Sequence, residues 1–404
     1  MSSLKDKRAI VVGAGPAGLA AAELLAQAGV SVVIHDRMPN PARKFLLAGR
    51  GGLNLTHSEA LDTLLNRYGT ARERLEPAIQ EFPPEALRDW CEGLGIETFV
   101  GSSGRVFPKT MKASPVLRAW LARLDGMGVR LETRSRWMGW DGDALVFDRA
   151  GERRIEACDA AVFALGGASW PRLGSDGSWQ AAFAEHGAKI EALKPANSGF
   201  LVDWSDVFKN KFAGEPLKLA RFSFGGEEVR SEAVITGYGI EGGAIYALSS
   251  ALRETLETNE VALLEIDLMP DTPLDKLVQK LSGHVKDSLS NRLRKAGLSP
   301  VAASLLREDM LGAGLQSNPA SLAERIKAVH IRLTGAAPIE RAISTAGGVG
   351  WESVGEDFSL RSDPLSFVCG EMLDWEAPTG GYLLQGCFAT GRAAARGALK
   401  RLGA

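Results

Sequence analysis

Three glycines near the start of the chain have the spacing of a loop that binds a dinucleotide. Gly13, Gly15 and Gly18 form a G-x-G-x-x-G motif, whose remaining positions are Ala14, Pro16 and Ala17. In such a motif the first glycine permits a tight turn, the second lets the backbone approach a pyrophosphate, and the third lets the helix pack on the strands. The N-terminus of the following helix offers N–H groups and partial positive charge to the phosphates.

The residues around this motif predict the strand–helix–strand unit that it requires. Residues 8–12 form an apolar run typical of a buried parallel strand, and residues 17–28 predict a helix that Gly29 ends. Residues 30–34 predict the next strand, which leads to Asp36. A carboxylate at this position can accept hydrogen bonds from an adenosine ribose. The unit predicts a bound dinucleotide but does not distinguish NAD from FAD.

A second group of glycines near the other end of the chain separates these two cofactors. Residues 160–164 and 365–368 predict two further buried strands, followed by Gly166 and by Gly370 with Glu371. Gly380 and Gly381 then open a predicted helix that runs to the C-terminus. A nicotinamide dehydrogenase has no evident need for this closing segment, whereas the sequence here resembles FAD proteins with two dinucleotide folds.

This resemblance implies roles for the closing segment. Glu371 would accept a hydrogen bond from a ribityl hydroxyl, and backbone N–H groups near Gly381 and Tyr382 would meet N1 and O2 of the flavin. A positive helix end at this edge would stabilise the negative charge that develops when the flavin is reduced.

Four longer blocks narrow the resemblance to one family. Residues 44–59, 164–179, 235–246 and 370–385 are similar to segments of the bacterial YhiN-like and BaiN-like flavoproteins, and they occur in the family's order along essentially the whole chain. Many relatives carry a cysteine in the first block, where this chain has Leu53 before Asn54. The chain resembles the subgroup with the sequence GRGGLNLT, and a mechanism that uses that thiol is not expected.

Two clusters of cofactor-binding residues follow from the motif and the resemblance. The first cluster is expected to contain Gly13, Ala14, Gly15, Pro16, Ala17, Gly18, Asp36, Arg37, Lys44, Gly51, Gly52 and Asn54. The second is expected to contain Ala164, Gly166, Gly370, Glu371, Gly380, Gly381, Tyr382 and Gln385. Lys44 and Arg50 could equally be solvated loop charges.

The middle of the chain has two stretches of different composition. Residues 196–271 carry 13 acidic and six basic residues, and the alternating runs 219–224 and 228–235 predict strands joined by a turn at Gly225–Gly226. Residues 274–334 carry ten Lys or Arg and five Asp or Glu, with apolar residues at helical spacing. Residues 342–351 predict a strand that returns to the first stretch.

These stretches predict an α/β protein of three domains. The resemblance implies a Rossmann-like FAD-binding domain of the glutathione-reductase type (residues 1–195 and 361–404). A β-barrel-like domain (196–272 and 336–360) is inserted in it, and a helical cap (273–335) is nested in the barrel-like domain.

Composition excludes several other classes of protein. Among 404 residues, 47 Lys and Arg oppose 49 Asp and Glu, so the net charge of -2 gives no general attraction to nucleic acid or anionic lipid. The four cysteines form no C-x-x-C pair, which argues against disulfide frameworks, zinc sites and thiol–disulfide catalysis. No apolar run is long enough to span a membrane, so we expect a cytoplasmic protein without a metal. Nothing indicates an oligomeric state.

The leading hypothesis is an FAD-dependent oxidoreductase that reduces a C=C bond in a small conjugated substrate, a preference that comes from the resemblance alone. No second dinucleotide motif is present, so NAD(P)H is expected to dock transiently as the reductant. Candidate catalytic residues are Arg50, His57 and Tyr238. His57 could instead be a structural hydrogen-bonding residue, and Tyr238 could instead be a packing aromatic of the barrel-like domain.

Three alternatives remain open from the sequence. The substrate could be a uracil in RNA, reduced to dihydrouridine, for which the basic helical stretch is the internal support. The protein could also be an FAD-binding redox sensor or assembly factor without turnover. Finally, it could be an amine or hydroxy-acid oxidase.

Overall fold

The computed structural model describes residues 4–49, 51–283, 285, 287–311 and 318–403. The chain forms two compact units, one made of Met1–Lys194 with Ser344–Ala404 and the other of Pro195–Ile343. Each unit has its own hydrophobic core. We describe them separately.

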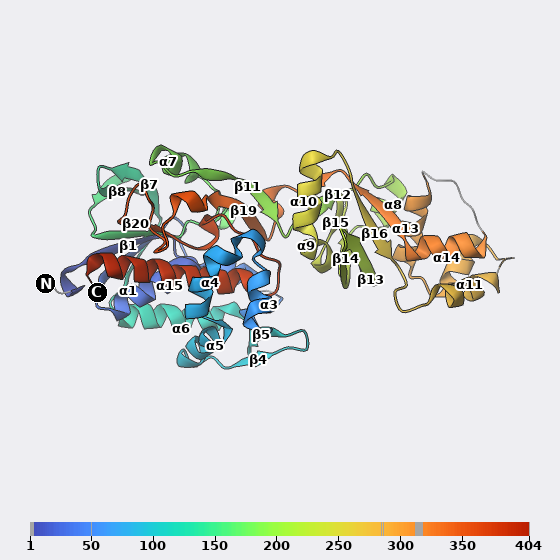
Figure 1. The fold of residues 1–404 in the computed structure, drawn as a ribbon, viewed down its shortest axis with the longest axis horizontal. Coiled ribbons are helices and arrows are strands. Elements are labelled where there is room, and N and C mark those ends of the chain that lie inside the picture. Colours follow the sequence, from blue (N-terminus) through green and yellow to red (C-terminus); the bar gives the residue numbers. More distant parts are fainter. Residues whose placement is uncertain (1–3, 50, 284, 286, 312–317, 404) are drawn as a thin grey trace. The chain divides into compact units, whose positions relative to one another are not determined.

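A five-stranded parallel sheet lies at the centre of the first unit (Figure 1). Its order is β20 (Ser366–Val368), β10 (Ala160–Phe163), β1 (Arg8–Val12), β2 (Ser31–Asp36) and β6 (Arg130–Thr133). The four apolar runs that predicted strands are therefore confirmed. From β1 the chain runs to β2 and β6 on one side and later crosses to β10 and β20 on the other. In sheets of this kind ligands bind at such a reversal, outside the carboxyl ends of the strands.

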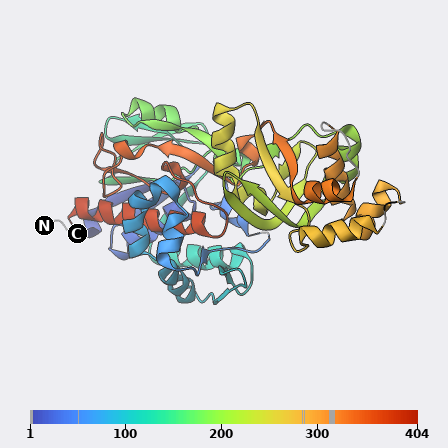
Figure 2. The same ribbon diagram turned by 45° about the vertical axis from the view of Figure 1, so that its right-hand side comes forward.

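Helices α1 (Pro16–Gln27) and α15 (Tyr382–Leu402) lie side by side in this unit, as Figures 1 and 2 show for the N-terminal blue and C-terminal red segments. Their contact is close because glycines of the C-terminal segment face Ala17. A Cβ atom on Gly391 would lie 2.2 Å from the carbonyl oxygen of Ala17, and one on Gly370 would lie 2.7 Å from the Cβ atom of Ala17. The two ends of the chain meet at this residue.

A buried carboxylate fixes the other face of α1. Glu23 is fully buried and accepts hydrogen bonds from the indole N–H groups of Trp90 and Trp120, at 2.9 and 2.7 Å. The guanidinium of Arg123 lies 3.0 Å from its other oxygen. This network ties α1 to α5 (Pro84–Gly93) and α6 (Ala113–Gly126), because these three donors come from those helices.

Smaller sheets complete the first unit. They are β3 (Thr56–His57) with β5 (Arg105–Pro108) and β4 (Thr98–Val100); β7 (Ser135–Asp141) with β8 (Ala144–Arg149) and β9 (Glu152–Glu156); and β11 (Ile190–Ala196) with β19 (Ser344–Val349). The remaining α-helices among its described residues are α2 (Arg43–Ala48), α3 (Leu61–Asn66), α4 (Arg72–Glu81) and α7 (Gln180–Glu185).

The second unit contains a seven-stranded antiparallel sheet with two edges, so the barrel-like domain is an open sheet. The order is β17 (Val329–Leu333), β16 (Ala262–Asp267), β13 (Pro216–Phe224), β14 (Glu227–Ile235), β15 (Gly239–Glu241), β12 (Phe200–Leu201) and β18 (Gly335–Ala336). The predicted hairpin turn is present: Gly225 and Gly226 have φ values of 59° and 87°, which suit the tight turn between β13 and β14.

Helices cover this sheet. They are α8 (Asp206–Phe212), α9 (Gly243–Ala247), α10 (Ser249–Thr258), α11 (Leu274–Ser282), α12 (Leu289–Ala296), α13 (Pro300–Met310) and α14 (Pro319–Lys327). The residues of α11 to α14 share one hydrophobic core with the strands, so the predicted cap is not a compact unit of its own. In Figure 2 these orange helices gather at one end of the unit.

Two predicted boundaries are wrong. Residues 329–333 were expected within the helical cap, but they form β17, because Val329, Ile331 and Leu333 alternate with exposed residues and pair with β16. Residues 344–360 were expected in the barrel-like domain, but they belong to the first unit, where β19 pairs with β11.

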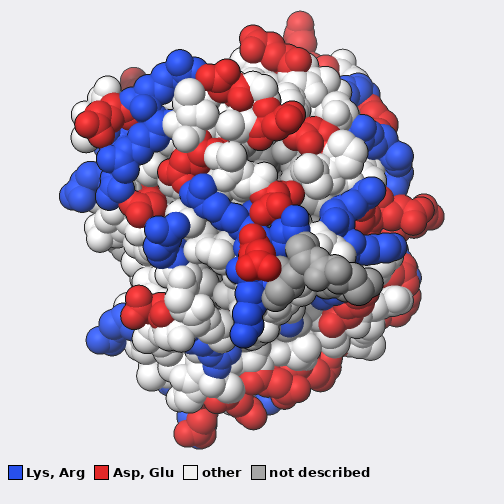
Figure 3. Space-filling view, turned by 90° about the vertical axis from the view of Figure 1, so that its left-hand side faces the viewer, with Lys and Arg blue, Asp and Glu red and all other residues white. Residues whose placement is uncertain are grey.

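Among the described helices, none is both long enough and apolar enough to cross a bilayer. On the face seen in Figure 3, basic and acidic side chains are interspersed, in keeping with the small net charge.

The contact between α1 and α15 makes a prediction about stability. We expect Gly391→Ala to lower the free energy of unfolding by about 2–4 kcal/mol, because the new methyl group would overlap the backbone of Ala17. Urea denaturation measures this change. The matched control is Gly126→Ala at the end of α6, where a Cβ atom would meet nothing within 4 Å. Equal stability of the two variants would contradict the close contact.

Candidate functional site

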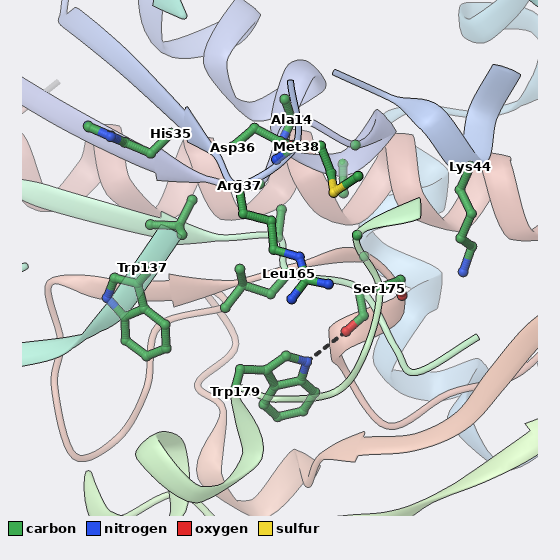
Figure 4. A pocket seen from close by; sticks show the side chains of 18 of the residues that line it. Ala14, His35, Asp36, Arg37, Met38, Lys44, Trp137, Leu165, Ser175 and Trp179 are labelled. Atoms are coloured by element: carbon green, nitrogen blue, oxygen red, sulfur yellow. Dashed lines mark hydrogen bonds between the residues drawn. The ribbon is translucent and has the colours of Figure 1, made fainter. Parts of the chain in front are cut away.

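A cavity of about 230 Å³ lies at the carboxyl ends of β1 and β10, at the reversal in the order of the sheet. Figure 4 shows Asp36 and Ala14 on one side of it and Trp137 and Trp179 on the other. The lining comes from the β1–α1 loop, the end of β2, the start of β7, the turn after β10 and the segment after β20. These segments belong to both ends of the chain, as the sequence predicted.

The glycines of the motif differ in the space that surrounds them. Gly13 has a φ of 105°, and a Cβ atom there would lie 2.3 Å from the carbonyl oxygen of Ala164. A Cβ atom on Gly18 would lie 1.9 Å from the carbonyl oxygen of Gly13, so only glycine lets α1 approach the strand. Gly15 is different, because a Cβ atom there would meet nothing within 4 Å. Since Gly15 lines the cavity and precedes the N-terminus of α1, the open space fits a pyrophosphate.

Asp36 holds the backbone of this loop. Its carboxylate accepts hydrogen bonds from the N–H groups of Ala14 and Met38, at 2.8 and 2.7 Å. Burial raises the pKa of Asp36, and these backbone donors and Arg37 only partly offset that effect. Each carboxylate oxygen keeps a second lone pair, so a ribose hydroxyl can still donate to it. Arg37 instead pairs with Asp176 and donates to the carbonyl of Pro171.

Lys44 and Glu371 form an ion pair in the wall of the cavity, with 2.6 Å between the ammonium nitrogen and a carboxylate oxygen. Lys44 also lies 2.8 Å from the hydroxyl of Ser169, and the second oxygen of Glu371 accepts from the backbone N–H of Thr345. The hydroxyl oxygen of Thr345 accepts from the N–H groups of Ala168 and Ser169. The pair thus joins the first sequence block (residues 44–59), the turn after β10 and the segment after β20.

Trp137, Ser175 and Trp179 line the cavity although none of them was among the expected site residues. Ser175 and Trp179 lie in the sequence block 164–179, whereas Trp137 lies in none of the four blocks. Trp179 donates to the carbonyl of Gly166 at 2.9 Å, and the hydroxyl of Ser175 donates to the carbonyl of Gly167 at 2.9 Å. The indole nitrogen of Trp137 is buried, and the described residues offer it no acceptor. A buried donor without an acceptor is costly, so this group is a candidate to contact a ligand.

Residues 44–59, the first of the four sequence blocks, contain a second buried polar atom without a hydrogen-bond partner among the described residues. Gly51 has open space at its Cβ position, whereas Gly52 has a φ of 115° and lies against the side chains of Met111 and Phe107. The side-chain oxygen of Asn54 is buried, and no described residue donates to it. Asn54 and Gly51 do not line the cavity itself. Arg50 lies outside the described residues.

The glycines at the start of α15 serve a close approach to β3. Gly381 has a φ of 97°, and a Cβ atom on it would lie 2.6 Å from the Cα atom of Thr56. Gln385, one turn into the helix, is fully buried; its amide donates to the carbonyl of Phe82 and accepts from the hydroxyl of Thr56. Its side chain offers no surface to a ligand, which argues against the side-chain contact with FAD that we expected. Gly380, Gly381 and Tyr382 are not in the cavity lining.

His57 is a structural residue by its contacts. Its Nδ1 atom accepts from the backbone N–H of Glu59 at 3.1 Å, so Nε2 donates to the carbonyl of Ser103 at 2.9 Å. Its ring stacks on that of Tyr382 with 5.5 Å between the centroids. Because both ring nitrogens are used, the structure favours the alternative role given to His57 over catalysis.

Tyr238 belongs to the second unit, in the turn between β14 and β15. Its hydroxyl donates to the carboxylate of Glu241, and the guanidinium of Arg341 lies 5.5 Å from the centre of its ring. Burial and the neighbouring Glu241 raise the pKa of Tyr238. The phenol is therefore protonated at neutral pH.

Two thiols line the cavity but are not reactive. Burial raises the pKa of Cys387 to about 12 and also raises the pKa of Cys369. Cys91 and Cys158 have pKa values raised to about 12 and about 11 by burial. Since the thiolate is the reactive form, these cysteines do not suit thiol–disulfide chemistry.

Comparison with known proteins decides the family. The profile of the HI0933-like protein Rossmann domain matches residues 7–397. The chain belongs to this family. The resemblance inferred from the four sequence blocks is thereby confirmed, and so is the α/β fold with an FAD-binding Rossmann domain. The protein is an FAD-dependent oxidoreductase.

Curated relatives match along their whole length. A 3-dehydro-bile acid delta(4,6)-reductase of Clostridium scindens is 26% identical over 97% of this chain and 98% of its own. Ribosomal RNA dihydrouridine synthases of Escherichia coli and Haemophilus influenzae are 22% and 23% identical over 96% of this chain and 97% of theirs.

Solved structures support the fold. A 3-ketosteroid delta1-dehydrogenase of Sterolibacterium denitrificans has a TM-score of 0.54 at 12% identity, covering 97% of this chain and 99% of its own. A flavocytochrome c3 fumarate reductase has a TM-score of 0.51 at 15% identity, covering 98% of this chain and 79% of its own. At such low identity these likenesses concern the fold alone.

The open space at Gly15 makes a prediction about binding. We expect Gly15→Ala to weaken FAD binding at least 10-fold, by about 1.4 kcal/mol or more, while the stability of the FAD-free protein stays unchanged, because the methyl group would enter only the ligand's space. Titration of FAD-free protein, followed by flavin fluorescence, measures the affinity. Gly18→Ala is the control. Its methyl group would overlap the carbonyl oxygen of Gly13, so this variant should lose stability even without FAD. If Gly15→Ala bound FAD with the affinity of the wild type, the pyrophosphate would not lie beside Gly15.

Proposed function

We propose that the protein reduces a C=C bond conjugated with a carbonyl group in a small molecule. The observation that carries this proposal is the full-length similarity to the 3-dehydro-bile acid delta(4,6)-reductase. The cavity at the reversal of the sheet and the absence of a reactive thiol among the described cysteines support it. The identity of the substrate is not part of the proposal.

The chain's residues would hold FAD along its length. The N-terminus of α1 beside Gly15 would face the pyrophosphate, and Asp36 would accept from the adenosine ribose. Glu371, oriented by Lys44, would accept from a ribityl hydroxyl, and the N-terminus of α15 would face the pyrimidine edge of the flavin. The unpaired indole N–H of Trp137 and the unpaired amide oxygen of Asn54 are further contacts for the cofactor.

When bound and reduced, FAD would be the source of the hydride for the β carbon of the conjugated system. A proton must then reach the α carbon from a general acid or from water. NAD(P)H would supply the hydride that reduces FAD, docking without a dinucleotide domain of its own.

A second candidate is the reduction of a uracil in RNA. The two ribosomal RNA dihydrouridine synthases among the relatives favour it. The chemistry is related, because the C5=C6 bond of uracil is conjugated with the carbonyl at C4. The two candidates therefore share the cofactor and the electron source. They differ in whether a small molecule or an RNA carries the C=C bond.

An anaerobic stopped-flow experiment tests the proposed function. We expect NADH or NADPH to bleach the flavin absorbance, and we expect a panel of conjugated enones or a uracil-containing RNA to restore it. Mass spectrometry should find the oxidant heavier by two hydrogen atoms. A flavin that neither nucleotide reduces, or that only oxygen reoxidises rapidly with release of peroxide, would overturn the proposal.

A further inference from the structure

The small sheet β3–β5–β4 of the first unit has one face that is buried where β3 pairs with β5 and exposed at Val100 of β4. We call the opposite face of this sheet the open face. Thr56 of β3 and Val106 of β5 are paired in register and fully buried. Phe107 follows Val106 and points to the opposite face, where it pairs in register with Phe99 of β4. Figure 1 places β4 and β5 at the lower edge of this unit, beyond α5.

Two aromatic rings lie on the open face. The rings of Phe99 and Phe107 stack with 5.8 Å between centroids and 30° between planes. Phe99 is 38% exposed, and Met111 beside them is 37% exposed at a φ of 60°, which is unusual for a residue other than glycine. Solvent-exposed aromatic rings on an open sheet face are the surface on which proteins stack unpaired bases.

Cations flank these rings. Arg105 pairs in register with His57 on the same face, and Lys112 follows Met111 at the start of α6. Both are exposed, and within the described residues neither has an ion-pair partner. Lys109, by contrast, pairs with Glu97. Two unneutralised charges beside an aromatic pair are complementary to the phosphates of a nucleic acid strand.

This face is continuous with the part of the first unit that the family resemblance gives to the flavin ring. His57 stacks on Tyr382 at the first turn of α15, and a Cβ atom on Gly52 would lie 3.6 Å from the ring of Phe107. A base bound on the open face is therefore next to the residues expected to hold the reactive end of FAD.

The basic stretch of the second unit is a separate surface. Three of its cations are paired, Lys295 with Asp287, Arg325 with Asp309 and Lys327 with Asp267. Other cations of the stretch are exposed, namely Lys276, Lys280, Arg294 and Arg332. RNA docking on this stretch therefore stays an expectation from the sequence, and the test below includes Arg294 for that reason.

We propose that the open face of β4 and β5 binds single-stranded nucleic acid, with a base stacked on Phe99 and Phe107 and with phosphates at Arg105 and Lys112. Binding as such does not depend on the reaction. The further step, that the bound strand carries the uracil that is reduced, rests on the second candidate of the proposed function, which is the reduction of a uracil in RNA.

Fluorescence polarisation with the FAD-loaded, full-length protein tests this proposal. The probes are fluorescein-labelled oligonucleotides of twelve uridines and of twelve thymidines. We expect the uridine strand to bind, with an affinity that falls as salt is added, and Arg105→Gln with Lys112→Gln should reduce the slope of log Kd against log salt by about 0.7 for each charge removed. The thymidine strand distinguishes RNA from DNA as the source of the same contacts.

Variants of the rings separate stacking from apolar contact. Phe99→Leu keeps an apolar side chain but removes the ring, and we expect it to weaken binding about 10-fold. Arg294→Gln, in α12, is the control and should bind like the wild type. Circular dichroism and FAD absorbance check that each variant is folded and loaded.

Two outcomes would overturn the proposal: no salt-dependent binding of either strand, or wild-type affinity in both the Phe99→Leu and the Arg105→Gln/Lys112→Gln variants. Binding of a conjugated steroid ketone at this face without binding of either strand would overturn it as well. Strand binding without reduction of uracil would leave the surface intact and refute only the second form of the proposed function. Reduction of an enone without strand binding would refute this surface and leave the reduction of a small molecule intact.

Discussion

The contact at Ala17 is the constraint on which the site depends. Gly391 and Gly370 can approach this residue only because they lack side chains, and their approach brings the C-terminal segment to the loop that follows β1. The ion pair between Lys44 and Glu371 can form only after that, because its partners come from opposite ends of the chain. The cavity at the reversal of the sheet is thus built from two distant segments, which matches a cofactor as long as FAD.

Features with local causes could be predicted from the sequence. An apolar run followed by a glycine turn predicted the bounds of β1. The geometry shows why glycine is needed at positions 13 and 18, whereas the place of Gly15 beside a pyrophosphate stays a prediction. The turn at Gly225–Gly226 was equally local. The family match then added the cofactor, which no single motif distinguishes. Strands and turns whose causes lie in adjacent residues were therefore predicted correctly.

Features with distant causes could not be predicted. Thr345 caps the turn after β10 from 176 residues away, and nothing near either residue indicates the contact. Trp137 lies in a strand whose pattern shows only that one of its faces is buried. Val329–Leu333 has the alternation of a strand, but it follows four helices and its partner β16 lies more than sixty residues earlier. In the sequence, Glu23 only interrupts an apolar stretch. In the structure its buried carboxylate accepts hydrogen bonds from three donors of two other helices, and it holds those helices against α1.

The late position of α15 in the chain has a consequence for how the protein is made. All of the chain between α1 (Pro16–Gln27) and α15 (Tyr382–Leu402) must be synthesised before α15 can cover Ala17, so a nascent chain lacks this contact for most of its synthesis. The wall of the cavity formed by the segment after β20 is likewise missing over that period.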